Sequence, residues 1–213
     1  MRHGLQHHRS RTRARQRVRA LLAAGLVLGA GATATSASWT DVEYGTGSFA
    51  SSVFATESSV NGSTYAANAS APGATATVSG PFAPGVSAYF PVLVRTTAAS
   101  IGGTVSVGGA TLGGPDATTL GAALVYRVVR TTGTCGAAAF TGSPVFVVGA
   151  AAVSRPLTTA QEVGVTNSLA AAGTAAPGTP TGFCFEITLP AGAPNSLQGK
   201  AATATWPLQA TSL

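Results

Sequence analysis

The chain has 213 residues, of which only 8% are charged, and its formal net charge is +6 at pH 7. Seven of the twelve basic residues lie within the first 19 positions, so residues 38–213 hold only five basic and six acidic residues. Nucleic-acid binding needs clustered cations on a folded surface, and this distribution excludes such a patch from the main body of the chain. The sparse charge suits an extracellular surface or one that packs against copies of itself, although a GC-rich genome would also explain the Ala- and Gly-rich composition.

The first 37 residues have the three-part organisation of an export signal. An arginine-rich segment over residues 1–19 precedes an apolar stretch over residues 20–34, which is followed by small residues. We expect a signal peptidase to cut between Ala37 and Ser38, with Ala34 as the alternative last residue of the signal. The apolar stretch is shorter than the about 20 residues that span a bilayer. The sequence therefore predicts a secreted domain over residues 38–213 that contacts the membrane only through the uncleaved signal; a permanent anchor is the alternative.

Beyond residue 38, short apolar segments rich in Val, Thr, Phe and Tyr are separated by Gly, Pro, Asn and Ser. This pattern is typical of a single all-β sandwich or barrel and shows no strong helical period. The expected strands are, in chain order, Gly47–Ala55, Ala74–Ser79, Val86–Thr97, Gly103–Val107, Gly121–Thr131, Val145–Val148, Phe183–Leu189 and Ala201–Gln209.

In three of these strands, apolar residues alternate with others, which places the apolar set on one face of a sheet. The alternating sets are Val86, Ala88, Phe90, Val92 and Val94; Leu124, Tyr126 and Val128; and Phe183, Phe185, Ile187 and Leu189. Pro91 and Pro207 lack a backbone donor, so we expect each to lie at a sheet edge or a bulge. Two connections, Thr131–Pro144 and Ser154–Gly182, are predicted to be surface loops, and a capping-box pattern in the second predicts a short helix over Leu157–Val163.

Cys135 and Cys184 are the only cysteines in the chain. In an exported protein a single pair of cysteines most simply forms a disulfide, which would tie the first of these loops to the strand that begins at Phe183. A metal pair or a redox centre is the alternative, but the chain has no Cys-x-x-Cys spacing and no histidine after Ala37. The sequence therefore predicts a disulfide.

The absence of histidine after Ala37 also limits the chemistry of the secreted part. Ser-His-Asp and Cys-His catalysis and the common zinc hydrolase sites each need at least one histidine. The six acidic residues are dispersed except for Asp41 and Glu43, which would need a rigid setting to bind calcium or hydrolyse a glycoside. Near a chain end, a solvated face of a strand is the simpler interpretation. The sequence predicts no enzymatic activity, no metal site and no cofactor.

The stretch GAGATATSASWTDVEYGTGSFAS, which crosses the predicted cut, resembles the start of exported proteins processed by the SipW-type signal peptidase. The matching positions are Ala37, Ser38, Trp39, Asp41, Ser48, Phe49 and Ala50. Two later stretches, VSGPFAPGVSAYFPVLVRTTAASIGGTVSV and NSLQGKAATATWPLQATS, are similar to central and closing strands of the same TasA/camelysin-like family, although Leu208 replaces the last aromatic residue. The resemblance implies an antiparallel jelly-roll sandwich and assembly into extracellular, biofilm-type fibres at the surface of Gram-positive bacteria.

The resemblance also implies how copies join, because the N-terminal strand of one subunit would complete a sheet of the next. We expect this donor strand over residues 38–54, with Trp39, Asp41, Val42, Tyr44, Phe49 and Phe54 as the residues of the assembly segment. Cleavage by the signal peptidase would free the segment and permit a homopolymer. Two alternatives stay open: the segment is the first strand of its own domain, or the protein is a soluble secreted sandwich that binds a wall or matrix ligand.

The predicted cut has a direct test. The secreted protein should begin at Ser38, because Thr35 and Ala37 supply the small side chains that a signal peptidase reads. N-terminal sequencing of protein from the culture medium measures this. Recovery of chains that still carry Met1 in the membrane fraction would contradict both the cut and the extracellular assignment.

Overall fold

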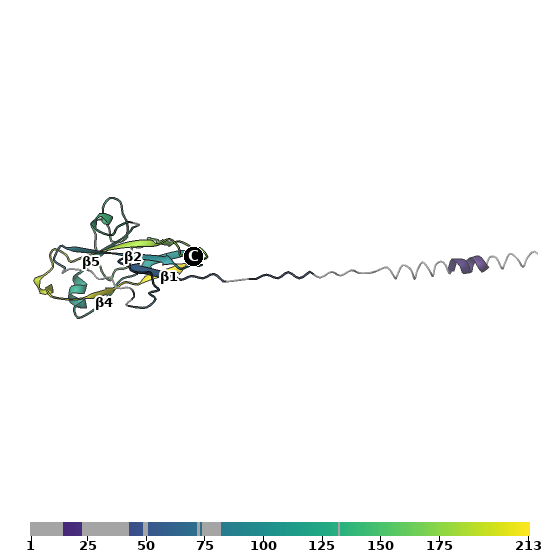
Figure 1. Cartoon of the computed structure of the whole chain (residues 1–213), viewed down its shortest axis with the longest axis horizontal. Coiled ribbons are helices and arrows are strands. Elements are labelled where there is room, and N and C mark those ends of the chain that lie inside the picture. Colours follow the sequence, from purple (N-terminus) through teal and green to yellow (C-terminus); the bar gives the residue numbers. More distant parts are fainter. Residues whose placement is uncertain (1–14, 23–42, 49–50, 72, 74–81, 132) are drawn as a thin grey trace, which may run out of the picture. The chain divides into compact units, whose positions relative to one another are not determined.

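The computed structural model describes residues 15–22, 43–48, 51–71, 73, 82–131 and 133–213 (Figure 1). The chain divides into two units, Met1–Phe49 and Ala50–Leu213. In the first unit, residues 15–22 are helical and residues 43–48 have no regular secondary structure. Within the described ranges, no helix combines the length and the hydrophobicity that crossing a membrane requires.

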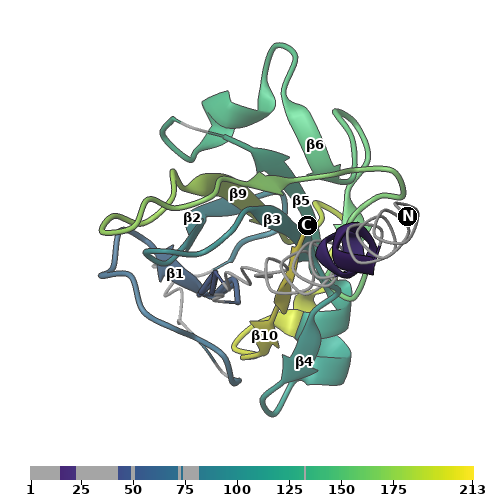
Figure 2. The same ribbon diagram turned by 90° about the vertical axis from the view of Figure 1, so that its right-hand side faces the viewer.

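The second unit is an all-β sandwich, as the sequence predicts, and all pairings between its strands are antiparallel (Figure 2). The large sheet has the strand order β1-β2-β9-β5-β6, with β7 also pairing with β5, and smaller sheets have the orders β11-β3-β8 and β10-β4. The strands are β1 Thr56–Val60, β2 Ser87–Thr96, β3 Gly103–Val107, β4 Thr111–Gly113, β5 Val125–Arg130, β6 Val145–Val148, β7 Arg155–Pro156, β8 Ser168–Leu169, β9 Thr181–Thr188, β10 Thr203–Thr205 and β11 Leu208–Ser212. The helices are short: a π-turn over Ala117–Gly121 and 3₁₀ turns over Ala137–Phe140 and Asn195–Leu197.

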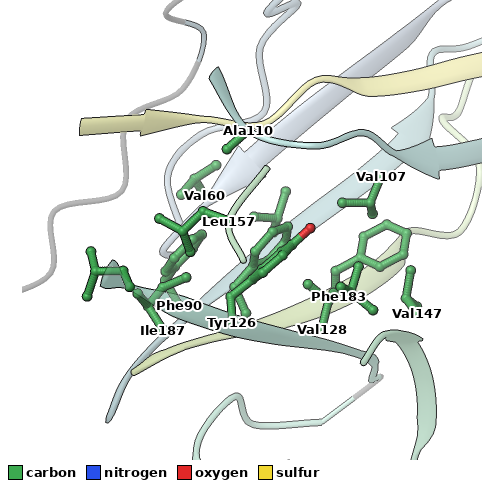
Figure 3. Packing of buried hydrophobic residues seen from close by; sticks show 14 of the residues in the cluster. Val60, Phe90, Val107, Ala110, Tyr126, Val128, Val147, Leu157, Phe183 and Ile187 are labelled. Atoms are coloured by element: carbon green, nitrogen blue, oxygen red, sulfur yellow. The ribbon is translucent and has the colours of Figure 1, made fainter. Parts of the chain in front are cut away.

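One apolar core joins the large sheet to the smaller ones (Figure 3). Tyr126 of β5 and Phe185 of β9 are among its largest fully buried side chains, and Val105 and Val107 of β3 belong to the same cluster. Phe90 of β2 stacks on Phe185 with the ring centroids 4.9 Å apart and the planes 13° from parallel. Removing this apolar surface from water is the main force that holds the two layers together.

The predicted alternation is confirmed in β5 and, from Phe90 onward, in β2. It is absent from β9, whose residues are buried on both faces, and Val86 lies before β2 and is 47% exposed. In β2, Phe90, Val92 and Val94 are buried while the residues between them are half-exposed. Pro91 lies in an interior strand, but its carbonyl accepts a bond from Asn61 N, directly after the end of β1. The N and C=O of one residue in an antiparallel strand point to the same side. The side of Pro91 that lacks an N–H donor therefore faces Asn61, beyond the end of β1. At this point β2 is an edge of the sheet, as the sequence predicts for a proline.

The strand boundaries differ from the prediction where tight turns interrupt the pattern. The predicted strand Gly47–Ala55 is wrong in its position, because the regular strand is β1, and between residues 51 and 55 only Val53 forms an isolated bridge. Strand β5 starts later than predicted since the chain first makes the π-turn. The predicted strand Ala201–Gln209 divides into β10 and β11 at Trp206, whose ring packs against the core, and the proline after it. The predicted strand Ala74–Ser79 lies outside the described residues.

The connection Ser154–Gly182 is not the surface loop that we expected. Leu157 and Leu169 are 3% exposed and belong to the core, and the side chain of Asn167 is fully buried with its Nδ2 donating to Val105 O at 3.1 Å. The predicted helix over Leu157–Val163 is also wrong, because this segment forms turns whose backbone follows the sheets instead of coiling. The conformation of this segment is therefore determined by the burial of its two leucines in the core rather than by the local capping-box pattern.

The buried phenol of Tyr126 predicts how the fold fails at high pH. Its hydroxyl donates to Thr159 O, and burial raises the pKa of Tyr126 to about 12. An unfolded tyrosine ionises near pH 10, so the unfolded state loses its proton first. The contribution of Tyr126 to the free energy of unfolding should therefore be fully present below about pH 10 and be lost as the pH rises toward 12. Urea unfolding at a series of pH values measures this. The Tyr126→Phe variant should lose this part of the pH dependence; an unchanged alkaline profile would contradict the assignment.

Candidate functional site

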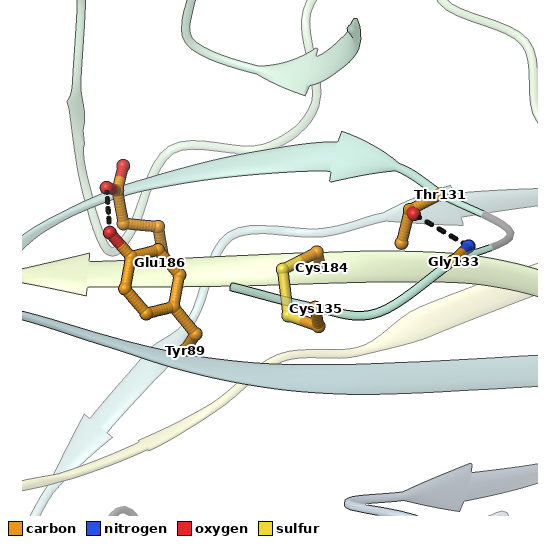
Figure 4. Close-up of a disulfide and its surroundings, with 6 residues drawn as sticks. All are labelled: Tyr89, Thr131, Gly133, Cys135, Cys184 and Glu186. Atoms are coloured by element: carbon orange, nitrogen blue, oxygen red, sulfur yellow. Dashed lines mark hydrogen bonds between the residues drawn. A yellow bond between two sulfur atoms is a disulfide. The ribbon is translucent and has the colours of Figure 1, made fainter. Parts of the chain in front are cut away.

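The most elaborate local arrangement is a flap, residues 133–144, that covers the outer face of the large sheet. Cys135 in the flap forms a disulfide with Cys184 of β9, with the Cα atoms 5.2 Å apart, as the sequence predicts (Figure 4). Phe140 of the flap is buried in a small second cluster with Val129 and the fully buried Cys184. A sheet face that would otherwise meet solvent is thus covered by a segment that a covalent bond holds down.

An ion pair lies beside the disulfide under the same flap. Arg127 Nε and Glu186 Oε2 are 2.5 Å apart, and only 17% and 8% of the two side chains are exposed. The other carboxylate oxygen accepts from the hydroxyl of Tyr89 at 3.0 Å (Figure 4). The guanidinium also lies over the ring of Phe140 at 5.1 Å and donates to Ala151 O. Burial and the bond to Glu186 raise the pKa of Tyr89, which keeps its phenol protonated as a donor.

The charged groups of this cluster already have partners within the protein. Both oxygens of Glu186 accept hydrogen bonds from neighbouring side chains, and the guanidinium of Arg127 is held by a carboxylate, two carbonyl oxygens and two aromatic rings. A general acid or base needs a polar atom that can reach a substrate. The arrangement instead links the flap, β5, β9 and β2 to one another, which is a structural role.

Three further ion pairs involve the other acidic residues of the second unit. Their closest atoms are 2.7 Å apart for Arg95–Glu57, 2.8 Å for Arg155–Glu162 and 2.7 Å for Lys200–Asp116. Tyr65 stacks on the guanidinium of the first pair at 3.7 Å. These cation partners keep the pKa of Glu162 and Asp116 below the ordinary values. Among the residues that the structure describes, no three metal-ligating side chains come together.

The clearest candidate for a binding site is the outer edge of β11. Pro207 O accepts from Gly108 N, and Leu213 N donates to Gly102 O, so the odd-numbered residues of this stretch bond to β3. Antiparallel pairing alternates, so the N–H and C=O groups of Leu208, Ala210 and Ser212 point away from β3. In the described part of the chain no strand pairs with this side. Its sequence, LQATS, also lacks the charges that usually protect an exposed edge.

Two other strand edges of the same unit, those of β1 and β6, already hold backbone hydrogen bonds. On the free side of β1, Ser58 exchanges two backbone hydrogen bonds with Ala66. On the free side of β6, Val147 O accepts from Glu162 N. The edge of β11 therefore differs from both of them, and it presents the backbone donors and acceptors that an added strand needs.

The structure places only part of the predicted assembly segment. Phe54 packs against the core of its own domain, next to Gly103 of β3, and Ile101 N donates to Val53 O. Phe54 is therefore an internal anchor, and a donor strand would have to end before Val53. Tyr44 is 91% exposed. The predicted residues Trp39, Asp41, Val42 and Phe49, and the cleavage residues Ala37 and Ser38, lie outside the described residues.

Sequence reasoning missed the features that depend on register between distant strands. The pair Arg127–Glu186 exists because β5 and β9 place these two residues directly opposite each other. The predicted strand Ala201–Gln209 joins β10 to the first two residues of β11 and omits Ala210 to Ser212, so it gives no open edge. The proline before an uncharged strand was the only signal for it, since a proline there indicates a break in pairing.

No protein-family model matches the chain, and no curated protein or solved structure is significantly similar to it. The resemblance to the TasA/camelysin-like family therefore remains a prediction from sequence motifs.

The ion pair under the flap makes a prediction about stability. Glu186→Gln should destabilise the protein by about 3 kcal/mol, because it leaves the nearly buried guanidinium of Arg127 without a counter-ion. Glu162→Gln is the matched control, since 34% of that side chain is exposed and its pair with Arg155 is well solvated. Urea unfolding at pH 7 measures both changes. Equal effects of the two substitutions would contradict the importance assigned to the covered pair.

Proposed function

We propose that this protein is an exported structural subunit that assembles, by strand addition, into filaments at the cell surface. The observation that carries the proposal is the open, uncharged edge of β11, with the backbone groups of Leu208, Ala210 and Ser212 directed outward. A strand from a second copy would satisfy these groups and extend the smaller sheet. The incoming strand would be the segment from Ser38 to the residues before Val53.

Two independent features support export. The first 37 residues have the organisation of a cleavable signal, with the signal peptidase as the enzyme that removes it. The Cys135–Cys184 disulfide needs an oxidising compartment to persist, which favours the outside of the cell. While the signal holds Ser38 at the membrane, the segment behind it is not free to reach a second copy. Cleavage would therefore start assembly outside the cell.

The geometry of the contact favours filaments over closed dimers. The donor is the N-terminal segment and the acceptor is the C-terminal strand, so the two surfaces are different. Such a head-to-tail contact leaves one donor and one acceptor free on every growing chain, and it produces open filaments unless the rotation closes a ring. The same arrangement agrees with the jelly-roll fold and the fibres that the TasA/camelysin-like resemblance implies.

A secreted binding module for a wall or matrix ligand is the competing function. A sandwich that binds carbohydrate through aromatic side chains would present them on its surface. Trp206 instead packs inside, with its ring centroid 5.4 Å from that of Phe185. This packing removes the one described tryptophan from such a role and favours the structural proposal.

Blocking the edge tests the assembly directly. Ala210→Pro removes an outward N–H and places the proline ring in the path of an incoming strand, while the neighbours of Ala210 keep their bonds to β3. We expect the secreted variant to stay folded but to form no filaments in negative-stain microscopy and light scattering. Ala210→Ser is the matched control, because it keeps the N–H and should form filaments. Removing residues 38–48, which leaves the anchor Phe54 in place, should also abolish assembly.

The outcomes separate the parts of this proposal. Circular dichroism and thermal unfolding show whether Ala210→Pro remains folded. Filaments from the folded proline variant would exclude β11 as the acceptor. A wild-type protein that stays monomeric at high concentration, over a range of pH and salt, would rule out assembly altogether.

A further inference from the structure

Arg130 differs from every other basic residue of the second unit. Arg95, Arg127, Arg155 and Lys200 each bind a carboxylate within 2.8 Å. Within the described ranges Arg130, at the end of β5, has no carboxylate partner, and its Nη1 donates to the backbone oxygen of Thr166 at 3.2 Å. The second unit has few charged side chains, and nearly all of them form ion pairs. The exposed guanidinium of Arg130, which bonds to the main chain instead, is an exception.

This guanidinium borders a small pocket that is open to solvent. The cavity has a volume of about 220 Å³ and is lined by Arg130, Thr131, Pro180, Thr181 and Gly182. The hydroxyl oxygen of Thr131 accepts from Gly133 N at 3.0 Å, and its proton has no acceptor among the described residues (Figure 4). A Cβ at residue 182 would collide with Thr131 O. Glycine at this position therefore allows β9 to approach the backbone of Thr131, whose N–H donates to Gly182 O.

We propose that this pocket, the Arg130 pocket, binds a carboxylate group carried by a molecule of about the size of a uronic acid. The guanidinium offers paired N–H groups in a plane, which is the geometry that a carboxylate accepts. The single positive charge matches a monoanion, whereas a phosphate dianion would remain half-neutralised. No acidic side chain lines the pocket to compete for the guanidinium. The Thr131 hydroxyl supplies a further donor, and the ring of Pro180 supplies an apolar wall.

The ligand comes from outside the folded unit. All four of its acidic residues, Glu57, Asp116, Glu162 and Glu186, are already bound to basic partners. A separate molecule is therefore the source of the carboxylate. This inference does not depend on the proposed assembly edge, because none of the pocket residues belongs to β11.

Glucuronate is the probe, titrated into the secreted protein and followed by amide chemical shifts. We expect saturable shifts in the millimolar range at Thr131, Thr181 and Gly182, and none with glucose, which has the same ring without the charge. Arg130→Gln should abolish the shifts. Arg130→Lys keeps the charge but loses the planar pair of donors, so it should weaken binding severalfold. Both variants should remain folded because the side chain is exposed.

The outcomes decide the proposal. Saturable shifts with glucuronate in the wild-type protein that are lost in Arg130→Gln would support it. Absence of shifts in the wild-type protein, shifts that persist in Arg130→Gln, or equal shifts with glucose would each overturn it.

Discussion

The fold depends on the burial of β9 on both of its faces. This strand pairs with β2 along eight residues and with β5 along six, and it is the centre of the large sheet. Its inward residues, such as Phe185, fill the core, which is the ordinary state of one face in a sandwich. Its outward residues Cys184 and Glu186 are also buried, so the other face needs a cover. Without a cover, the outward face of β9 would be exposed to solvent. The flap, the disulfide and the ion pair with Arg127 together cover it.

This requirement explains which parts of the structure could be predicted from the sequence. The inward sides of β2, β5 and β9 follow from alternation alone, and a lone pair of cysteines in an exported chain predicts its own bond. The outward side of β9 carries no apolar pattern of its own, because Cys184 lies between Gly182 and Glu186 there and the flap that covers it comes from about 40 or more positions away in the sequence. The pairing of Glu186 with Arg127 needs the register between β5 and β9, which periodicity does not provide.

The same limit applies to the candidate site. The sequence indicates export and a segment able to join copies, but it does not indicate which edge would receive that segment. The predicted strand Ala201–Gln209 runs through Trp206 and ends inside β11, whereas in the structure Trp206 packs against the core and β11 continues to Ser212. The sequence likewise places Phe54 in the predicted donor strand, and only its packing against Gly103 assigns it to the domain. Local sequence identifies strands, but the free side of a strand is a property of all the strands around it.

The pairing of nearly every charge inside its own domain has a kinetic consequence. Five basic and four acidic residues follow Ala50, and four ion pairs join most of them at short range. Such dipoles cancel within a few ångströms, so the domain projects almost no long-range field. Two copies would then meet without electrostatic steering, at rates of about 10⁵–10⁶ M⁻¹ s⁻¹ that change little with ionic strength. The association proposed above would therefore proceed at a similar rate in dilute water and in brine, and its rate would depend on the concentration of the protein rather than on the salt around it.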